Sequence, residues 1–243
     1  DDGIAYVRLT RFTRNCASEV EEAIVELTDE NEVKGLVLDL RGNPGGLLNE
    51  SVSLCNLFID KNQEVVSTKG KIKDWEKSYK TMKEPLYKEL PLAVLINQSS
   101  ASASEIVSGT IQDLDRGVIL GKKSFGKGLV QQTRKLSYNS QLKVTVAKYY
   151  TPSGRCIQAL DYTNKNDDGS VGKVADSLKT AFKTRNGRTV YDGGGVDPDI
   201  VIEQEAFAKI VGSLVSKQLI FDFATEFVLK NDSIEAPGVF KIS

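Results

Sequence analysis

The segment PLAVLINQSSASASEIV, residues 91–107, decides the fold class of this chain. Its apolar run at residues 92–96 is typical of a buried parallel strand. The polar residues 97–100 interrupt that run, and a helix is predicted from about Ser102 to Leu114. A strand that leads through a turn into a helix is the building unit of α/β proteins.

The same unit recurs on either side of this segment. Residues 35–40 form a second apolar run, which the turn sequence RGNPGG at residues 41–46 ends, and a helix is predicted after it. A Ser18-x-x-Glu21 capping box predicts the start of another helix at Ser18. Further strands are predicted at residues 4–9, 64–68, 117–120 and 200–202, and a hairpin at 129–136 and 141–150. Because strands and helices interleave, the fold class is α/β.

Three stretches depart from this alternation. Residues 69–89 are polar and lysine-rich, which predicts an excursion from the core that could act as a cap or flap over a site. Residues 157–175 include an Asn-, Asp- and Gly-rich segment that predicts a mobile loop. Residues 206–228 have helical periodicity, so we expect a core at 1–205 and a helical extension at 206–243 that packs on it.

Composition excludes several classes of function. The chain has 243 residues, with 32 basic and 33 acidic side chains and a net charge of −1. This balance gives no global field for nucleic acid, and no phosphate-loop motif indicates nucleotide binding. No apolar run reaches the roughly 20 residues of a spanning helix. The chain contains no histidine, which excludes every histidine-based catalytic mechanism and leaves carboxylates, lysine, tyrosine or thiols for acid–base chemistry.

Serines at the start of the helix after residue 101 are candidate nucleophiles. A serine in the first helical turn lies beside unpaired backbone N–H groups, which can stabilise an oxyanion. Helix capping is an alternative explanation for the same serines, because serine is a favoured N-cap residue. The residue pattern alone does not choose among Ser100, Ser102 and Ser104.

A serine nucleophile needs a base, and without histidine lysine is the main candidate. Lys127 stands out because glycines, Phe125 and aliphatic residues surround it in SFGKGLV, residues 124–130. It could act as a base only if burial lowered its pKa toward neutrality. The alternative is that Gly-Lys-Gly forms an ordinary exposed turn. Gly45 and Gly46 could present N–H groups to an oxyanion, although a plain turn also accounts for them.

Several segments together resemble the carboxy-terminal processing, or tail-specific, protease family. They are residues 4–12, LDLRGNPGG at 38–46, 91–107, 121–131, YTPSGR at 150–155 and GGGVDPD at 193–199. The resemblance implies that Ser102 is the nucleophile, Lys127 the base and Gln131 the residue that orients the lysine. It implies an oxyanion hole from the N–H of Ala103 and of either Gly45 or Gly46. Asp113 lies where some members have an important acid, and a helical surface or capping role is the alternative.

The resemblance also implies a crotonase- or ClpP-like core of repeated ββα units, an unstructured polypeptide C-terminus as substrate, and neither cofactor nor metal. Family members usually carry a PDZ-like domain, and no segment of this sequence resembles one, so we expect a fragment of the protease core. Family members often act in the bacterial periplasm or at the envelope, so the resemblance implies such a location, although no signal-peptide pattern opens the given sequence. One departure is Ser99, where many members have glycine.

Three alternatives remain open from the sequence. The SxxK at residues 124–127 and SxN at 137–139 resemble motifs of penicillin-binding proteins, but a KTG motif is absent. The chain could be a non-catalytic module that binds peptides or hydrophobic ligands on the same fold, which an exposed Lys127 would favour. It could also hold polypeptide tails without cutting them.

Overall fold

The computed structural model describes residues 3–30, 32–73, 76–165, 168–203, 208–231, 233–236 and 239–240. The chain divides into two compact units, residues 1–202 and 203–243. Nearly all of the predicted strand–helix alternation falls in the first unit.

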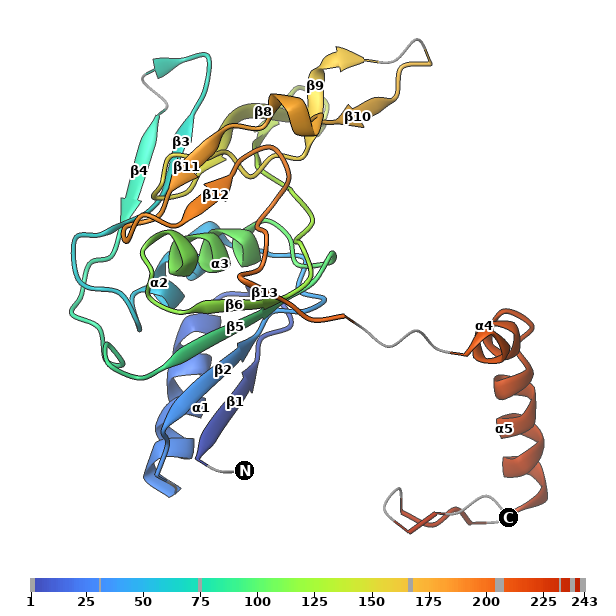
Figure 1. Ribbon diagram of the computed structural model, residues 1–243. Helices are drawn as coiled ribbons and strands as arrows, with labels where there is room; N and C mark the ends of the chain where they lie inside the picture. The colour runs from blue at the N-terminus through green and yellow to red at the C-terminus, as the bar shows by residue number, and fades with distance from the viewer. Residues whose placement is uncertain are drawn as a thin grey trace. The chain divides into compact units, whose positions relative to one another are not determined.

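A five-stranded sheet in the order β1-β2-β5-β6-β13 forms the base of the first unit (Figure 1). Every neighbouring pair of strands in it is parallel, as expected for short apolar runs separated by helices. The strands are β1 (Ile4–Arg8), β2 (Gly35–Asp39), β5 (Leu92–Ile96), β6 (Val118–Gly121) and β13 (Ile200–Val201). The predicted strands and the α/β class are therefore confirmed.

Three helices pack with this sheet: α1 (Cys16–Glu30), α2 (Leu48–Cys55) and α3 (Ala103–Asp113). All residues of α3 are buried, because the helix lies between the five-stranded sheet and a second sheet (Figure 1). Ile106, Val107 and Ile111 belong to the same apolar core as the strand residues Leu38 and Val94. The Thr110 hydroxyl donates to the carbonyl of Val65 at 2.8 Å, which joins α3 to the second sheet. The helix after β5 is therefore held rigidly on both sides.

The first helix begins earlier than the capping box predicts. It starts at Cys16 rather than Ser18, because its free N–H groups find an acceptor far away in the sequence. Glu50 on α2 accepts the backbone N–H of Asn15 at 3.0 Å and of Ala17 at 3.2 Å. A carboxylate at a helix N-terminus satisfies the unpaired donors there and interacts favourably with the helix dipole.

The second sheet has four strands in the order β4-β3-β8-β7. They are β3 (Glu64–Lys69), β4 (Lys77–Lys80), β7 (Leu129–Lys135) and β8 (Gln141–Tyr150), and β7 and β8 form the predicted hairpin. Within residues 69–89, β4 pairs with β3 at the edge of this sheet. The Asn56 carboxamide then accepts the N–H groups of Met82 and Lys83 and fixes the segment after β4 to α2.

Residues 157–175 contain strands where a loop is expected from composition. β9 (Leu160–Lys165) and β10 (Val171–Lys173) form a two-stranded antiparallel sheet. The segment before β9 is anchored, because Ile157 and Ala159 are buried in the molecule. A further pair, β11 (Ala181–Lys183) and β12 (Thr189–Tyr191), is also antiparallel, and a short 3₁₀ helix spans Asp176–Leu178.

The second unit contains α4 (Lys209–Ser216) and α5 (Leu219–Lys230). The periodicity at residues 206–228 predicts one helix, but Gln218 adopts a left-handed conformation, φ 58°, that breaks it. Residues 204–207 lie outside the described residues. The packing of this extension on the core stays a prediction. Across the described chain, none of the helices has the length and apolar character needed to cross a membrane.

Candidate active site

Ser102 lies where β5 leads into α3, at the N-cap of that helix. Its backbone has φ 57° and ψ −112°, a conformation that is unusual for a residue other than glycine. Such strain persists only where surrounding contacts hold the backbone, and it is concentrated at functional sites. The contact at Ser102 is a hydrogen bond of 2.8 Å from its N–H to the Glu105 carboxylate. The local fold therefore presents Ser102 in a fixed, strained position at a helix start.

The structure separates Ser102 from its neighbouring serines. Ser100 and Ser104 are fully buried, and each hydroxyl donates to a backbone carbonyl, of Leu40 at 2.8 Å and of Asn43 at 2.9 Å. Ser102 is partly exposed. Of these three candidates, only Ser102 has both solvent access and a place beside the free N–H groups of the first helical turn.

Glu105 lies at the centre of the site, and its side chain is fully buried. Its Oε1 accepts the Ser124 hydroxyl at 2.5 Å and the Gly126 N–H at 2.6 Å. Its Oε2 accepts the N–H of Ser102 and of Lys127, both at 2.8 Å. Burial raises the pKa of Glu105, although these four donors act in the opposite direction. One carboxylate thus ties the α3 start to the loop that carries Lys127.

Lys127 is close to Ser102 through its backbone, but its side chain is exposed. Both backbone nitrogens donate to the same carboxylate oxygen, so they lie within two hydrogen-bond lengths of each other. Gln131 on β7 donates to the Thr145 hydroxyl at 3.5 Å, and among the described residues no hydrogen bond joins its side chain to Lys127. The structure places the backbone segments that carry Ser102 and Lys127 next to each other, but the Lys127 side chain is not buried.

The oxyanion candidates Ala103, Gly45 and Gly46 lie around the same turn. A Cβ on Gly45 would come within 2.9 Å of the Ala103 nitrogen, so the glycine loop closely approaches the α3 start. The Gly45 N–H already donates to the Asn43 side chain at 2.8 Å. Within the described part of the chain, no acceptor takes the N–H of Gly46 or of Ala103. The structure therefore distinguishes the two glycines that the sequence left equivalent.

Asp113 lies at the opposite end of α3 from Ser102. Eleven residues of helix separate them, which corresponds to about 16 Å. Asp113 is buried and forms an ion pair with the buried Arg155, at 2.8 Å. It also accepts the N–H of Ser153 at 3.0 Å, which joins α3 to the YTPSGR segment. The alternative of a helical surface role does not hold, because the side chain is enclosed.

Asp39 ends β2 and organises the turn that carries the glycines. Its carboxylate accepts the Tyr6 hydroxyl at 2.5 Å and two bonds from the Arg41 guanidinium, at 3.0 and 2.8 Å. Burial would raise the pKa of Asp39, but the donors from Arg41 and Tyr6 hold it below its ordinary value. Sequence reasoning missed Asp39, Asn43, Glu105 and Ser124 as positioning residues. Their short-range contacts, such as that of Asp39 with Arg41, are visible in the sequence, but each residue also has a partner 19 or more positions away that no local pattern contains.

Ser124, the serine of the SxxK match, is not available as a nucleophile. It is buried, its hydroxyl donates to Glu105, and the same oxygen accepts the N–H of Val196 at 2.7 Å. This hydroxyl links the lysine loop to the turn at residues 193–199. The interpretation as a penicillin-binding motif is therefore wrong for this chain.

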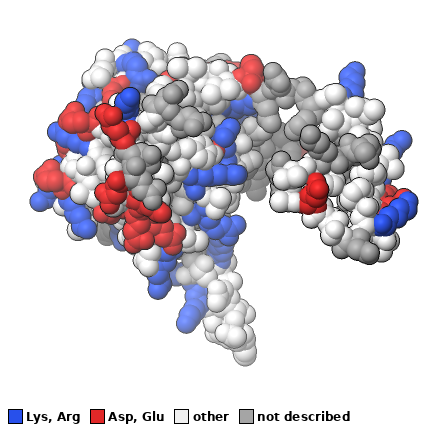
Figure 2. Space-filling model, turned by 90° about the horizontal axis from the view of Figure 1, so that it is seen from below, with Lys and Arg blue, Asp and Glu red and all other residues white. Residues whose placement is uncertain are grey.

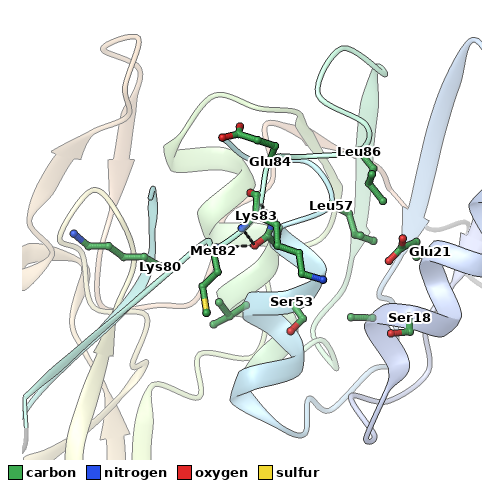
Figure 3. A pocket seen from close by; sticks show the side chains of 12 residues that line it. Ser18, Glu21, Ser53, Leu57, Lys80, Met82, Lys83, Glu84 and Leu86 are labelled. Carbon is green, nitrogen blue, oxygen red and sulfur yellow. Dashed lines mark hydrogen bonds between the residues drawn. The ribbon is translucent and has the colours of Figure 1, made fainter. Parts of the chain in front are cut away.

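Two further surface features lie on other elements. A cavity of about 460 Å³ opens between α1, α2 and the segment after β4, with Ser18, Ser53 and Met82 among its lining residues (Figure 3). Acidic side chains gather on the face of the molecule that is seen from below in Figure 2. Helix α1 carries the exposed acidic residues Glu19, Glu22, Glu26 and Asp29. None of these residues belongs to the segments around Ser102. Within the described residues no group of acidic and thiol side chains could hold a metal ion.

The sequence pattern of peptidase family S41 matches residues 3–166, and the chain belongs to that family. A carboxy-terminal-processing protease of Bartonella bacilliformis is 44% identical over 163 residues, which are 66% of this chain and 37% of that protein. The chain thus spans well under half of that relative's length. The solved photosystem II D1 C-terminal processing protease is 30% identical, with a TM-score of 0.63 over 84% of this chain and 44% of that one. The solved structure of a lipoprotein from Streptococcus agalactiae is 17% identical, with a TM-score of 0.52 over 84% of this chain and 63% of the lipoprotein. At that identity the similarity shows the fold alone.

Proposed function

We propose that this chain carries the catalytic centre of a serine endopeptidase that cuts polypeptides near their C-termini. The observation that carries the proposal is the shared contact of Ser102 and Lys127 with Glu105, in a chain of family S41. The carboxy-terminal processing relatives support the substrate class. We also propose that the fold is a crotonase- or ClpP-like core, which the repeated strand–turn–helix units support.

The reaction proceeds through an acyl-enzyme. Neutral Lys127 removes the proton from the Ser102 hydroxyl while its oxygen attacks the scissile carbonyl carbon. The N–H groups of Ala103 and Gly46 stabilise the oxyanion, and Gly46 is favoured over Gly45 because Asn43 already occupies the Gly45 N–H. The lysine then gives its proton to the leaving amine. Water, deprotonated by Lys127, hydrolyses the ester and restores Ser102.

Lys127 can act as a base at neutral pH only where water is excluded from its ammonium group. Its side chain is exposed in the structure, so we propose that the bound polypeptide covers it. Gln131 would orient the lysine only after its side chain leaves Thr145. Catalysis then depends on substrate binding to complete the site.

The exposure of Lys127 also favours a second candidate function, a non-catalytic module that binds peptides on the same fold. The two functions are separated by incubating the chain with an unstructured polypeptide tail and mapping products by mass spectrometry. Endopeptidase activity predicts new C-termini that Ser102→Ala and Lys127→Ala both abolish. Binding of the tail without any product, equal in wild type and Ser102→Ala, would support the binding module instead.

A further inference from the structure

A second cavity, of about 790 Å³, lies on the four-stranded sheet next to the lysine loop. It opens over β3, β7 and β8, with Leu160 and Tyr162 of β9 on another side. Leu129 lines it and follows Lys127 by two residues, a distance of about 7 Å in extended backbone. A polypeptide with its scissile bond at Ser102 would therefore reach this cavity within about three residues.

Three lysines line this cavity: Lys69, Lys71 and Lys148. Lys69 and Lys148 are directly opposite each other on β3 and β8, and Lys148 is opposite Leu129 on its other side. Like charges in opposed positions of neighbouring strands destabilise a sheet. No acidic residue is among the described lining residues, and among all described residues no carboxylate forms an ion pair with any of the three. Among the described residues, the sheet thus bears three lysines without an ion-pair partner beside the candidate catalytic centre.

The rest of the lining suits a side chain with an apolar stem. Leu129, Val146, Leu160 and the tyrosine rings supply apolar walls, and the Lys69 ammonium lies 4.9 Å from the centre of the Tyr150 ring. A ring face attracts a cation but leaves its outward N–H donors free for an anion. Glu76 and Asp192 act on Tyr150 electrostatically, but neither lines the cavity.

We propose that this cavity is a substrate subsite for a carboxylate-bearing residue of the polypeptide, bound within about three residues of the scissile bond. The inference rests on the proposed protease function and deepens it, because it names a chemical preference of the substrate. The carboxylate neutralises the opposed Lys69 and Lys148, while the stem packs on Leu129 and Leu160. An acidic side chain and the terminal carboxylate of a short tail share this chemistry.

The test uses one tail peptide with a single Glu, or its isosteric Gln, placed in turn at each position near the cut, as free acid and as C-terminal amide. Wild type should cleave the Glu peptide about fivefold more efficiently in kcat/KM than the Gln peptide at one position, a ratio typical of a partly exposed charge pair. Lys148→Gln should remove that ratio. Lys143→Gln, on the same strand but outside the cavity, should keep it. A ratio that depends only on the free terminus assigns the carboxylate to the chain end.

A binding measurement on Ser102→Ala separates this proposal from the protease function. Fluorescence anisotropy with the same peptides should show the Glu preference in Ser102→Ala and its loss in the double variant with Lys148→Gln. If wild type cleaves every peptide equally, the subsite is wrong and the protease function stands. If nothing is cleaved, the protease function fails and the anisotropy ratio alone decides the subsite. Equal affinities for Glu and Gln peptides, or a preference that survives Lys148→Gln, would overturn it.

Discussion

Ser102 and Lys127 share one hydrogen-bond acceptor: Oε2 of Glu105 lies 2.8 Å from the backbone nitrogen of each. The bond to Ser102 holds a strained backbone, and the bond to Lys127 fixes the loop that precedes β7 beside it. The relative position of the proposed nucleophile and base therefore depends on a residue that takes no proton in the reaction.

Glu105→Gln should lower kcat about 10²-fold with little change in KM, because displacement of a catalytic group by about 1 Å has an effect of that size. The amide NH₂ of glutamine cannot accept the backbone N–H groups that the carboxylate oxygen in its place accepts, so at least one of the four hydrogen bonds is lost. The free energy of unfolding should also fall by about 1–3 kcal/mol. Steady-state kinetics and thermal unfolding of the same preparation measure both effects.

Glu50→Gln is the matched control for this variant. Glu50 also accepts two backbone N–H groups through a carboxylate, but at the start of α1. The Glu50→Gln variant should have a lower free energy of unfolding, while its kcat stays near the wild-type value. An equal loss of kcat in both variants would mean that Glu105 acts only through global stability.

Asp113→Asn should destabilise the protein without changing the chemistry. Arg155 would remain buried without its carboxylate partner, which costs about 3–5 kcal/mol. Replacing both partners with apolar residues, Asp113→Leu with Arg155→Met, should restore part of that loss. Chemical denaturation measures the stability, and kcat below the unfolding temperature should stay unchanged. A large fall in kcat for the folded variant would place Asp113 in the catalytic machinery.

The contribution of Asp39 to stability should depend on pH in a defined direction. Its pKa in the folded protein is lower than the ordinary 3.8, so the folded state favours the ionised form. The stabilisation is therefore complete above about pH 4 and is lost as the pH falls through the folded pKa. The stability difference between wild type and Asp39→Asn, about 2 kcal/mol at pH 7 for hydrogen bonds to a charged group, should shrink toward zero below pH 3. A difference that stays constant down to pH 2 would contradict this.

Much of the fold could be predicted from the sequence because its elements follow local rules. The apolar runs at Leu92–Ile96 and Gly35–Asp39 have the length of buried parallel strands, and the hairpin alternates with period two. The misplaced helix start at Cys16 has a different cause. It depends on Glu50, which is 33 or more positions away, and no local pattern contains that contact. The break at Gln218 likewise has no glycine or proline to mark it.

The candidate site was predictable only in part for the same reason. The sequence offers several serines and two glycines that are equivalent on local grounds. Burial and hydrogen bonding distinguish them, since Ser100, Ser104 and the Gly45 N–H already have partners. Glu105 is three residues after Ser102 and reads as a capping residue, but its contacts with Ser124, Gly126 and Lys127 require the folded loop. The exposure of Lys127 is also a property of the fold alone.

Covalent labelling tests the central claim, that Ser102 is a nucleophile activated by Lys127, most directly. The chain is incubated with a fluorophosphonate across pH 6–10, and intact mass and peptide mapping locate the adduct. We predict one adduct on Ser102 whose rate rises with pH, absent in Ser102→Ala, strongly reduced in Lys127→Ala and retained in Ser99→Ala. No adduct at any pH, or an adduct that persists in Ser102→Ala, would contradict the account.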